Sequence, residues 1–431
     1  MLEKLFKLSE HGTNVKTEVL AGVTTFLTMA YIIFVNPAIL SQAGMDHGSV
    51  FVATCLAAAV GCFIMGFYAN YPIAQAPGMG LNAFFTYTVV LGMGHTWQVA
   101  LAAVFCSGVL FILLSLFKIR ELIINSIPMS LRLGISAGIG LFLALISLKN
   151  AGIVVGNEAT LVGVGDLTSL HAILGALGFI LTIVLVYRNV KAAVMIAILV
   201  ITAMGVIAGD VHYAGIIDMP PSIAPTFLQL DFSAITDVGM ISVVFAFLFV
   251  DLFDTAGTLV GVANKAGFVG EDGKIPRLNK ALLADSTATS IGALLGTSNT
   301  TSFVESTAGV AVGGRTGLTA VVVGILFLLA LFFSPLAGMV PAYATTGALF
   351  YVAILMLSGL VHIQWDDLSE AAPVAVVCLL MPLTFSIAEG IAMGFVTYAA
   401  IKLLSGKARE VHPGVWVLAF IFLMKFALTG A

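Results

Sequence analysis

Long hydrophobic stretches recur along the chain and are separated by short polar connections. With about 20 residues as the length that crosses a bilayer, fourteen stretches can be marked: 18–40, 48–69, 78–93, 97–117, 130–148, 169–187, 192–209, 238–260, 281–296, 306–314, 317–334, 343–361, 370–385 and 387–404. A further apolar run at 414–429 has Lys425 in its middle, and an interfacial or re-entrant helix fits it better than a fifteenth crossing. The pattern predicts an all-α polytopic membrane protein with 14 transmembrane segments.

Composition supports this fold class. Hydrophobic residues make up 60% of the 431 residues and charged residues only 9%, against about 25% charged in soluble domains. The net charge of −4 is too small to indicate a nucleic-acid partner. The four cysteines lie inside apolar runs without metal-ligand spacing, so we expect no metal and no cofactor.

The positions of Lys and Arg predict the orientation in the membrane. Cytoplasmic loops are enriched in both residues. With the N-terminus in the cytoplasm, 15 of the 18 basic residues lie in connections that face inward: Lys4, Lys7, Lys16, Lys118, Arg120, Arg188, Lys191, Lys265, Lys274, Arg277, Lys280, Arg315, Lys402, Lys407 and Arg409. We therefore expect both termini to be cytoplasmic and the protein to lie in the bacterial inner (plasma) membrane.

The two halves of the chain show a weak internal repeat. The paired positions are Pro128 with Pro341, Gly134 with Gly347, Gly61 with Gly292, and Gly78 with Gly309. Seven segments separate the copies, and an odd number inverts the second copy relative to the first. The chain therefore matches a 7+7 inverted repeat, an architecture typical of secondary transporters.

Two segments are interrupted by residues that do not favour helix. Pro72 and Pro77 interrupt the stretch at 71–82, and small hydroxyl residues crowd the stretch at 297–309. Irregular backbone at membrane depth persists only when it is buried in protein or lines a cavity. We expect short extended stretches followed by half-helices in segments 3 and 10, with backbone amides near Ala76 and Ser306 facing a ligand. The alternative of two ordinary extramembrane loops is disfavoured by the apolar runs on both sides.

Acidic residues inside the predicted spans are candidate functional groups. A charged side chain at mid-helix costs at least ~2.5 kcal/mol on insertion scales and marks a site by default. This argument favours Asp254 and Glu305 as site residues, whereas for Asp251 a structural role is an equal alternative. Asp285 and Glu389 are weaker candidates, because we expect them near a membrane interface or in a gate helix.

Carboxylates and helix N-termini together suit a neutral heterocycle. An ionised carboxylate only accepts hydrogen bonds, and free backbone amides only donate them, so the pair matches a ring edge with both kinds of group. Phe26, Phe84 and Phe303 could stack on a flat ring, although packing is the alternative role for each of them.

Four motifs in the same order along the chain resemble the AzgA-like purine permeases of the nucleobase–ascorbate transporter superfamily. They are EVLAGVTTFLTMAY at 18–31, APGMGLNAF at 76–84, LFDTAGT at 252–258 and VESTAGVAVGGRTG at 304–317. The likeness covers nearly the whole chain, and the motif at 76–82 is closer to the adenine-permease type.

The resemblance implies a core domain and a gate domain that alternate along the chain. The core would comprise 1–117 (segments 1–4) and 237–340 (segments 8–11). The gate would comprise 118–236 (segments 5–7) and 341–431 (segments 12–14 and the C-terminal apolar helix). Members of the family are not enzymes but proton symporters for adenine, guanine and hypoxanthine, are often homodimers, and work by an elevator-like movement of the core.

The resemblance also implies functional residues. Asp254 and Glu305 match the two substrate-binding acids, either of which would take the coupled proton, and Asn82 matches a polar residue of the third segment. The full set of expected substrate-binding residues is Asp254, Glu305, Asp251, Asn82, Ala76, Gln75, Ser306, Thr28 and Phe303.

Three other functions remain as alternatives. An anion carrier of the same fold would need a basic residue between the half-helices, for which Arg315 is the candidate. An intramembrane aspartyl protease is suggested by the G-x-G-D string at 163–166, but this string lies in an expected external loop. A passive channel differs from a carrier in showing no counterflow.

Overall fold

The computed structural model describes residues 2–116, 127–268 and 275–429. The predicted domain boundary at 117/118 and the basic residues Lys118, Arg120 and Lys274 lie outside them. The helices of the first half are α1 (Leu2–Phe6), α2 (Val15–Met29), α3 (Ile32–Leu40), α4 (His47–Ile64), α5 (Met79–Ala83), α6 (Trp97–Leu116), α8 (Met129–Asn150), α9 (Leu170–Tyr187) and α10 (Ala193–Ile207). Two π-helical segments, η2 (Met65–Ala69) and η3 (Phe84–Gly92), continue α4 and α5.

The helices of the second half are α11 (Val238–Ala266), α12 (Leu278–Leu295), α13 (Ser306–Ala311), α14 (Gly317–Ala330), α15 (Ser334–Gly338), α16 (Thr346–Leu357), α17 (Leu368–Leu383), α18 (Ile387–Leu404) and α19 (Pro413–Thr429). Short 3₁₀ turns extend or join them at η1 (Ser41–Ala43), η4 (Leu331–Phe333), η5 (Ala342–Thr345), η6 (Ser358–His362) and η7 (Ala408–Glu410).

Each predicted apolar stretch coincides with a helix. Within the described residues, nine helical segments are long and apolar enough to cross a membrane. The other predicted stretches correspond to shorter or more polar helices, namely α5 with η3, α10, α12, α13 and α17. The protein is therefore an all-helical membrane protein, with two short pairs of strands in the described part of the chain.

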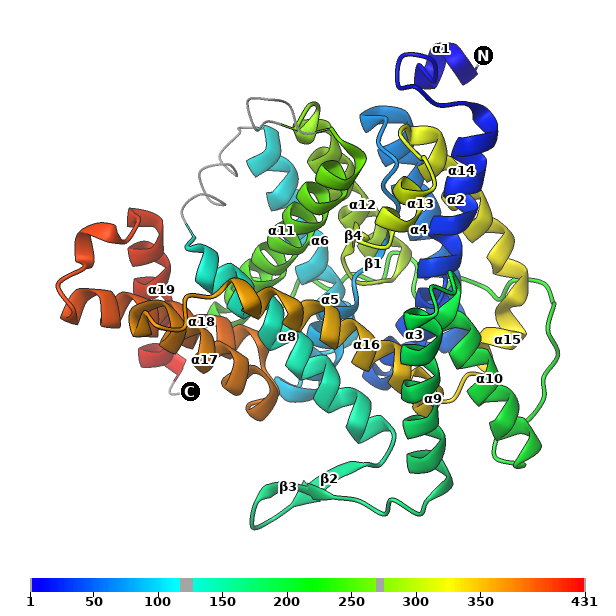
Figure 1. Ribbon diagram of the computed structural model, residues 1–431. Coiled ribbons are helices and arrows are strands. Elements are labelled where there is room, and N and C mark those ends of the chain that lie inside the picture. The colour runs from blue at the N-terminus through cyan, green and yellow to red at the C-terminus, as the bar shows by residue number, and fades with distance from the viewer. Residues whose placement is uncertain (1, 117–126, 269–274, 430–431) are drawn as a thin grey trace.

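The two interrupted segments meet in the middle of the fold, where each forms a short strand. β1 (Gln75–Pro77) pairs antiparallel with β4 (Thr300–Ser302), and Ala76 lies opposite Thr301. The N–H of Gly78 extends the pairing to the Asn299 carbonyl at 2.9 Å. The predicted extended stretches are thus confirmed, and each satisfies the backbone of the other far from water. α5 follows β1, and α13 follows β4 after a short turn (Figure 1).

The second strand pair lies at the surface. β2 (Val154–Asn157) and β3 (Leu161–Val164) form an exposed hairpin that projects from the end of the molecule opposite the N-terminus (Figure 1). Val164 is 75% exposed, so the G-x-G-D string lies at the surface, at the end of β3 and just after it, and not in a turn as the sequence suggests.

The glycine pairs of the sequence repeat have similar surroundings at one position and different ones at the other. A Cβ on Gly61 would lie 2.9 Å from the side-chain Oε1 of Gln75, and a Cβ on Gly292 would lie 2.6 Å from the hydroxyl of Thr300. The lack of a side chain at each glycine therefore lets an interrupted segment pack closely against the helix. Gly78, in contrast, precedes α5 as its N-cap, and Glu305 holds that place before α13. Gly309, the predicted counterpart of Gly78, lies inside α13.

The helices pack as two groups. In group I, α2, α4, α6, α11, α12, α13 and α14 contact one another around the paired strands. In group II, α8, α9, α10, α16, α17 and α18 contact one another. Figure 1 shows α8 and α16 of group II below the paired strands in that view.

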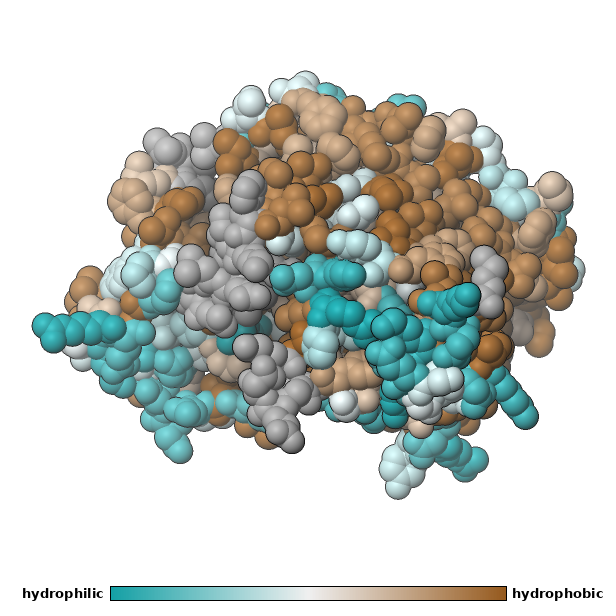
Figure 2. Space-filling view, turned by 90° about the horizontal axis from the view of Figure 1, so that it is seen from above, coloured by the Kyte–Doolittle hydropathy of each residue, from teal (hydrophilic) through white to brown (hydrophobic). Residues whose placement is uncertain are grey.

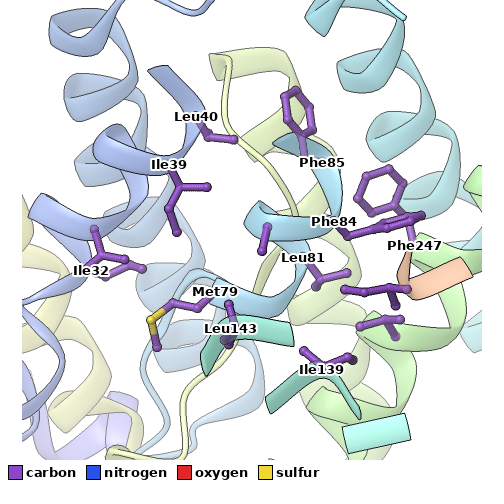
Figure 3. Packing of buried hydrophobic residues seen from close by; sticks show 14 of the residues in the cluster. Ile32, Ile39, Leu40, Met79, Leu81, Phe84, Phe85, Ile139, Leu143 and Phe247 are labelled. Atoms are coloured by element: carbon purple, nitrogen blue, oxygen red, sulfur yellow. The ribbon is translucent and has the colours of Figure 1, made fainter. Parts of the chain in front are cut away.

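The first half-helix is packed tightly between the groups. Figure 3 shows Met79 and Leu81 of α5 in the same apolar cluster as Ile139 and Leu143 of α8. Phe84 is fully buried with its ring 4.8 Å from that of Phe247. Phe84 therefore packs against α11 in this structure.

The surface matches a protein surrounded by lipid. In the view from the end that carries the N-terminus, hydrophilic residues gather over part of the face and hydrophobic residues cover much of the rest (Figure 2). Large apolar side chains such as Leu329 and Phe420 are 55% and 65% exposed, which suits a lipid environment.

Candidate functional site

A cavity of about 290 Å³ lies between the two groups of helices. Group I contributes Thr28 of α2 and residues at the start of α13, and group II contributes Tyr351 of α16 and the connection between α9 and α10. The lining residues are Thr28, Val186, Asn189, Val190, Lys191, Ala193, Val194, Val304, Glu305, Thr307, Ala308, Tyr351 and Leu355. Two of the predicted site residues, Thr28 and Glu305, therefore lie in this cavity.

Glu305 stands at the N-terminus of α13 with its carboxylate held by a tyrosine. The hydroxyl of Tyr31 donates to Glu305 Oε1 at 2.6 Å, and Tyr31 itself is 1% exposed. Because Tyr31 occupies one carboxylate oxygen, the other can accept from a ligand in the cavity. A charge-assisted hydrogen bond of this kind orients the acid as well as stabilising it.

Asp254 lies on an exposed face of α11. Asp254, Gly257, Gly261 and Asn264 follow one another at helical spacing, and all four are exposed. A Cβ on Gly257 or Gly261 would meet no described atom within 4 Å. Since a carboxylate facing hydrocarbon would be very costly, we expect this face to line water-filled space rather than lipid.

The carboxylate of Asp254 is barely engaged by the protein. Its hydrogen bond from the Thr301 hydroxyl is long, at 3.4 Å, and close to the limit of a hydrogen bond. Asp254 is therefore free to accept from a ligand, and Thr301 links it to β4.

Asp285 lies beneath the paired strands, fully buried. Ser302 and Gln75 donate to its Oδ1 at 2.8 and 3.1 Å. Thr255 donates to its Oδ2 at 2.8 Å. The expectation that Asp285 lies near a membrane interface or in a gate helix is wrong, because this acid ties α11 and α12 to both strands. A carboxylate with three donors is well satisfied as an anion.

Asp251 is also buried, one turn before Asp254 on α11. Asn299 and Thr289 contact its Oδ2 at 2.9 and 3.0 Å. Its Oδ1 has no hydrogen-bond partner among the described residues. Asp251 therefore faces the interior of group I and not the cavity.

The other predicted site residues are buried with Asp251. Asn82 accepts from the Ser298 hydroxyl, and its Nδ2 has no partner in the described parts of the chain. Ser306 accepts from the N–H of Ala74 at 3.0 Å, and Ala76 is fully buried in β1. Phe303 is 6% exposed. These residues hold the strands and half-helices in place.

Several site residues were not predicted from the sequence. Tyr31 and Tyr351 contribute polar and aromatic groups next to Glu305, yet each is an isolated tyrosine in an apolar run. Glu18 is fully buried and accepts from the backbone of Arg315, Thr316 and Thr319. Glu18 is part of the first motif, and its acidic character within a span was a usable signal.

Arg315 does not lie between the half-helices. Its guanidinium donates to the carbonyls of Val310 and Gly314 at 2.8 and 2.7 Å, beyond the end of α13. The basic residue that an anion carrier requires is thus not supplied by Arg315.

The arrangement supports recognition and not covalent chemistry. Asp254 is exposed on α11, and Glu305 lies at the start of the second half-helix in the wall of the cavity, with Thr28 and Tyr351 nearby. Such a site can accept hydrogen bonds from N–H groups of a flat neutral ligand while Tyr351 contacts its face.

Comparisons with known proteins agree with this geometry. The sequence profile of the Permease family matches residues 16–393. Adenine permease AdeP of Escherichia coli strain K12 is 51% identical over 431 residues, covering 100% of this chain and 97% of the relative. Guanine/hypoxanthine permease PbuG of Bacillus subtilis strain 168 is 48% identical over 437 residues, covering 99% of each chain.

Solved structures share the fold at low identity. The transmembrane domain of a cyanobacterial bicarbonate transporter, BicA, aligns with a TM-score of 0.69 and 15% identity, covering 87% of this chain and 97% of that domain. At this identity the likeness concerns the fold alone.

Proposed function

The chain belongs to the Permease family, and on that premise we propose that it imports purine nucleobases, adenine among them, together with protons. It is a multi-pass membrane transporter and not an enzyme. Relatives named as adenine and as guanine/hypoxanthine permeases are 51% and 48% identical. These values are too close to select one purine, so the proposal covers the class.

One observation in particular supports a purine: two acids retain carboxylate oxygens that can accept from a ligand, Glu305 in the wall of the cavity and Asp254 on the exposed face of α11. Glu305 is held by a single tyrosine and Asp254 by one long hydrogen bond. Neither acid forms a salt bridge with a described residue. Purine ring N–H and amino groups are donors, so these carboxylates match them, and a neutral ligand needs no cation to balance it.

The packing of the helices supports an elevator-like mechanism. Group I would be the core domain and group II the gate domain, and the cavity lies where they meet. We propose 14 crossings arranged as an inverted 7+7 repeat, with both termini in the cytoplasm of a bacterial inner membrane. In that orientation the cavity, which includes Lys191 of the α9–α10 connection, opens toward the cytoplasm.

The proposed substrate site combines Asp254 and Glu305 with Thr28, Tyr31 and Tyr351. Asn82, Ala76, Gln75, Ser306 and Phe303 would act through the position of the half-helices. The sequence assigns the coupled proton to Glu305 or Asp254.

The decisive test is uptake of radiolabelled adenine by cells that lack their own purine permeases and express this protein. We expect saturable uptake that a protonophore abolishes and that unlabelled purines, but not uracil or bicarbonate, inhibit. The matched control is Asp254→Asn, which keeps the shape of the side chain and should show background uptake at equal membrane abundance. Absence of nucleobase uptake by the unaltered protein, with membrane insertion verified, would refute the proposal.

A further inference from the structure

We propose that Asp251, and not an acid that faces open space, holds the proton that moves with the substrate, and that Thr289 transmits its protonation state to β4. This inference rests on the proposed function, since it assigns a residue to the proton step of purine symport. The observations behind it are three short contacts that can all be hydrogen bonds when Asp251 is protonated but not when it is ionised.

The hydroxyl of Thr289 lies between two acceptors. Its Oγ1 is 3.0 Å from Asp251 Oδ2 and 2.9 Å from the carbonyl oxygen of Thr300. A hydroxyl has one hydrogen to donate. If Asp251 is ionised, both partners of Thr289 are acceptors, and one of the two contacts has no hydrogen.

A proton on Asp251 Oδ2 resolves the conflict. The carboxyl O–H then donates to Thr289, and Thr289 donates to the Thr300 carbonyl. Asn299 Nδ2, 2.9 Å from the same oxygen, still finds a lone pair there, because a carboxyl oxygen that donates can also accept. Every short contact around Asp251 Oδ2 is thus a hydrogen bond when Asp251 is neutral.

The ionised form is disfavoured in this geometry. Thr289 would have to turn from Thr300 to Asp251, which leaves the strand carbonyl without that donor. Asp251 Oδ1 would carry charge while receiving no hydrogen bond from any residue in the described ranges. A buried charge with so few donors is costly, so loss of the proton favours a rearrangement of β4 or entry of water.

Among the described residues, the neighbours of Asp251 supply no compensating cation. Asp285 on α12 and Asp254 on α11 are the titratable groups that act on it. Ser107 of α6 and Asn299 before β4 face the same cluster and are uncharged. Asp285 differs from Asp251 in having three donors on its two oxygens, so it suits a permanent anion.

The strand β4 connects this proton to the substrate site. The carbonyl of Thr300 contacts Thr289, and the hydroxyl of the next residue, Thr301, contacts Asp254. Glu305 follows the strand and begins α13. A proton on Asp251 therefore fixes the strand in the position that presents Asp254 and Glu305 to the base, which gives positive coupling between proton and substrate.

The test compares purified wild type with Asp251→Asn. The asparagine amide can donate to Thr289 as the carboxyl O–H does, and the Asn299 amide can turn to accept through its Oδ1, which has no partner among the described residues, so the variant should imitate the protonated state permanently. For wild type we expect the Kd for adenine to rise as the pH is raised through the titration of Asp251, by at most about tenfold per pH unit for one linked proton. For Asp251→Asn we expect a Kd that stays at the low-pH value.

Transport in proteoliposomes gives the second readout. Asp251→Asn should retain adenine counterflow, which needs no proton, and should lose accumulation driven by a pH gradient. Thr289→Val, which keeps the side-chain volume but removes the relay, should also lose gradient-driven accumulation, whereas Thr289→Ser should keep it. If Asp251→Asn fails to fold, Thr289→Val still tests whether the Thr289 hydroxyl is needed for proton coupling.

Gradient-driven accumulation by Asp251→Asn, or equal behaviour of Thr289→Val and Thr289→Ser, would overturn the assignment. So would pH-independent binding with retained counterflow in Asp254→Asn or Glu305→Gln, since the coupled proton would then lie on that acid. Lack of adenine counterflow in wild type is a different failure, because it would remove the proposed function itself and this inference with it.

Discussion

Asp254 and Asp285 are both acids in helices of group I, but their surroundings are opposite. Asp254 faces open space and receives one long hydrogen bond. Asp285 is fully buried and receives three. The carboxylate of Asp254 can still accept hydrogen bonds from a ligand, whereas the oxygens of Asp285 already accept hydrogen bonds from Gln75, Thr255 and Ser302. The two acids therefore differ in the number of donors that the protein already commits to the carboxylate.

Replacing Asp285 should have the largest effect on the fold. Asp285→Ala leaves the donors of Gln75, Thr255 and Ser302 buried without their acceptor, at about 1–3 kcal/mol each. We expect poor yield and a fall in stability of about 3 kcal/mol or more, measured by thermal unfolding and size-exclusion chromatography in detergent. Asp166→Ala, at an exposed acid, is the control and should be neutral. A stable, monodisperse Asp285→Ala would show that the strands do not depend on this acid.

Replacing Asp254 should weaken adenine binding and leave the stability of the fold unchanged. Asp254→Asn removes the charge but leaves the fold, because only the 3.4 Å contact from Thr301 depends on it. Loss of a charge-assisted hydrogen bond to the substrate, worth about 1.5–3 kcal/mol, should weaken adenine binding about 10- to 100-fold. Calorimetry or scintillation proximity binding measures this, and the melting temperature should be unchanged. A variant that melts early would place Asp254 with the structural acids.

Tyr31→Phe should have an intermediate effect. It removes the hydroxyl that donates to Glu305 at 2.6 Å while keeping the ring in the core. Loss of one orienting hydrogen bond, about 1.5 kcal/mol to a charged acceptor, should raise the Kd for adenine about tenfold. Tyr87→Phe, whose hydroxyl contacts Gln42, is the matched control. Equal Kd values for the two variants would argue against an orienting role for Tyr31.

The smallest effect on binding is expected at the exposed face of α11. A side chain at Gly257 meets no described atom within 4 Å, so Gly257→Cys should fold and bind adenine with less than about a twofold change. Its thiol should react with a water-soluble methanethiosulfonate, and adenine should slow the reaction. The native Cys55 and Cys62 are fully buried and serve as internal controls. An unreactive Gly257→Cys would mean that this face does not line water.

The sequence predicts the local features of the site well. The apolar stretches correspond to helices, and the prolines at 72 and 77 indicate an extended stretch because proline cannot continue a helix. Asp254 and Glu305 stand out because isolated acids are costly in a membrane. These signals need only neighbours along the chain.

The sequence does not predict which acid faces open space. Asp251 and Asp254 are one turn apart, so helical periodicity alone places them on nearly the same face, yet only Asp254 is exposed. The difference comes from α12 and β4, which cover Asp251 from elsewhere in the chain. The role of Asp285 depends in the same way on two strands more than 200 positions apart, and no local pattern encodes their register.

The pairing of β1 with β4 also constrains how the protein is made. Gln75 and Ser302 are partners in this pairing. The backbone hydrogen bonds of β1 to β4 can therefore form only after most of the chain has been synthesised. Closing so long a loop is entropically costly and slow. An unpaired strand inside the bilayer is itself unfavourable. During biogenesis the first half must therefore persist as a loosely inserted intermediate, and a chain truncated before residue 300 would be a natural substrate for membrane quality control.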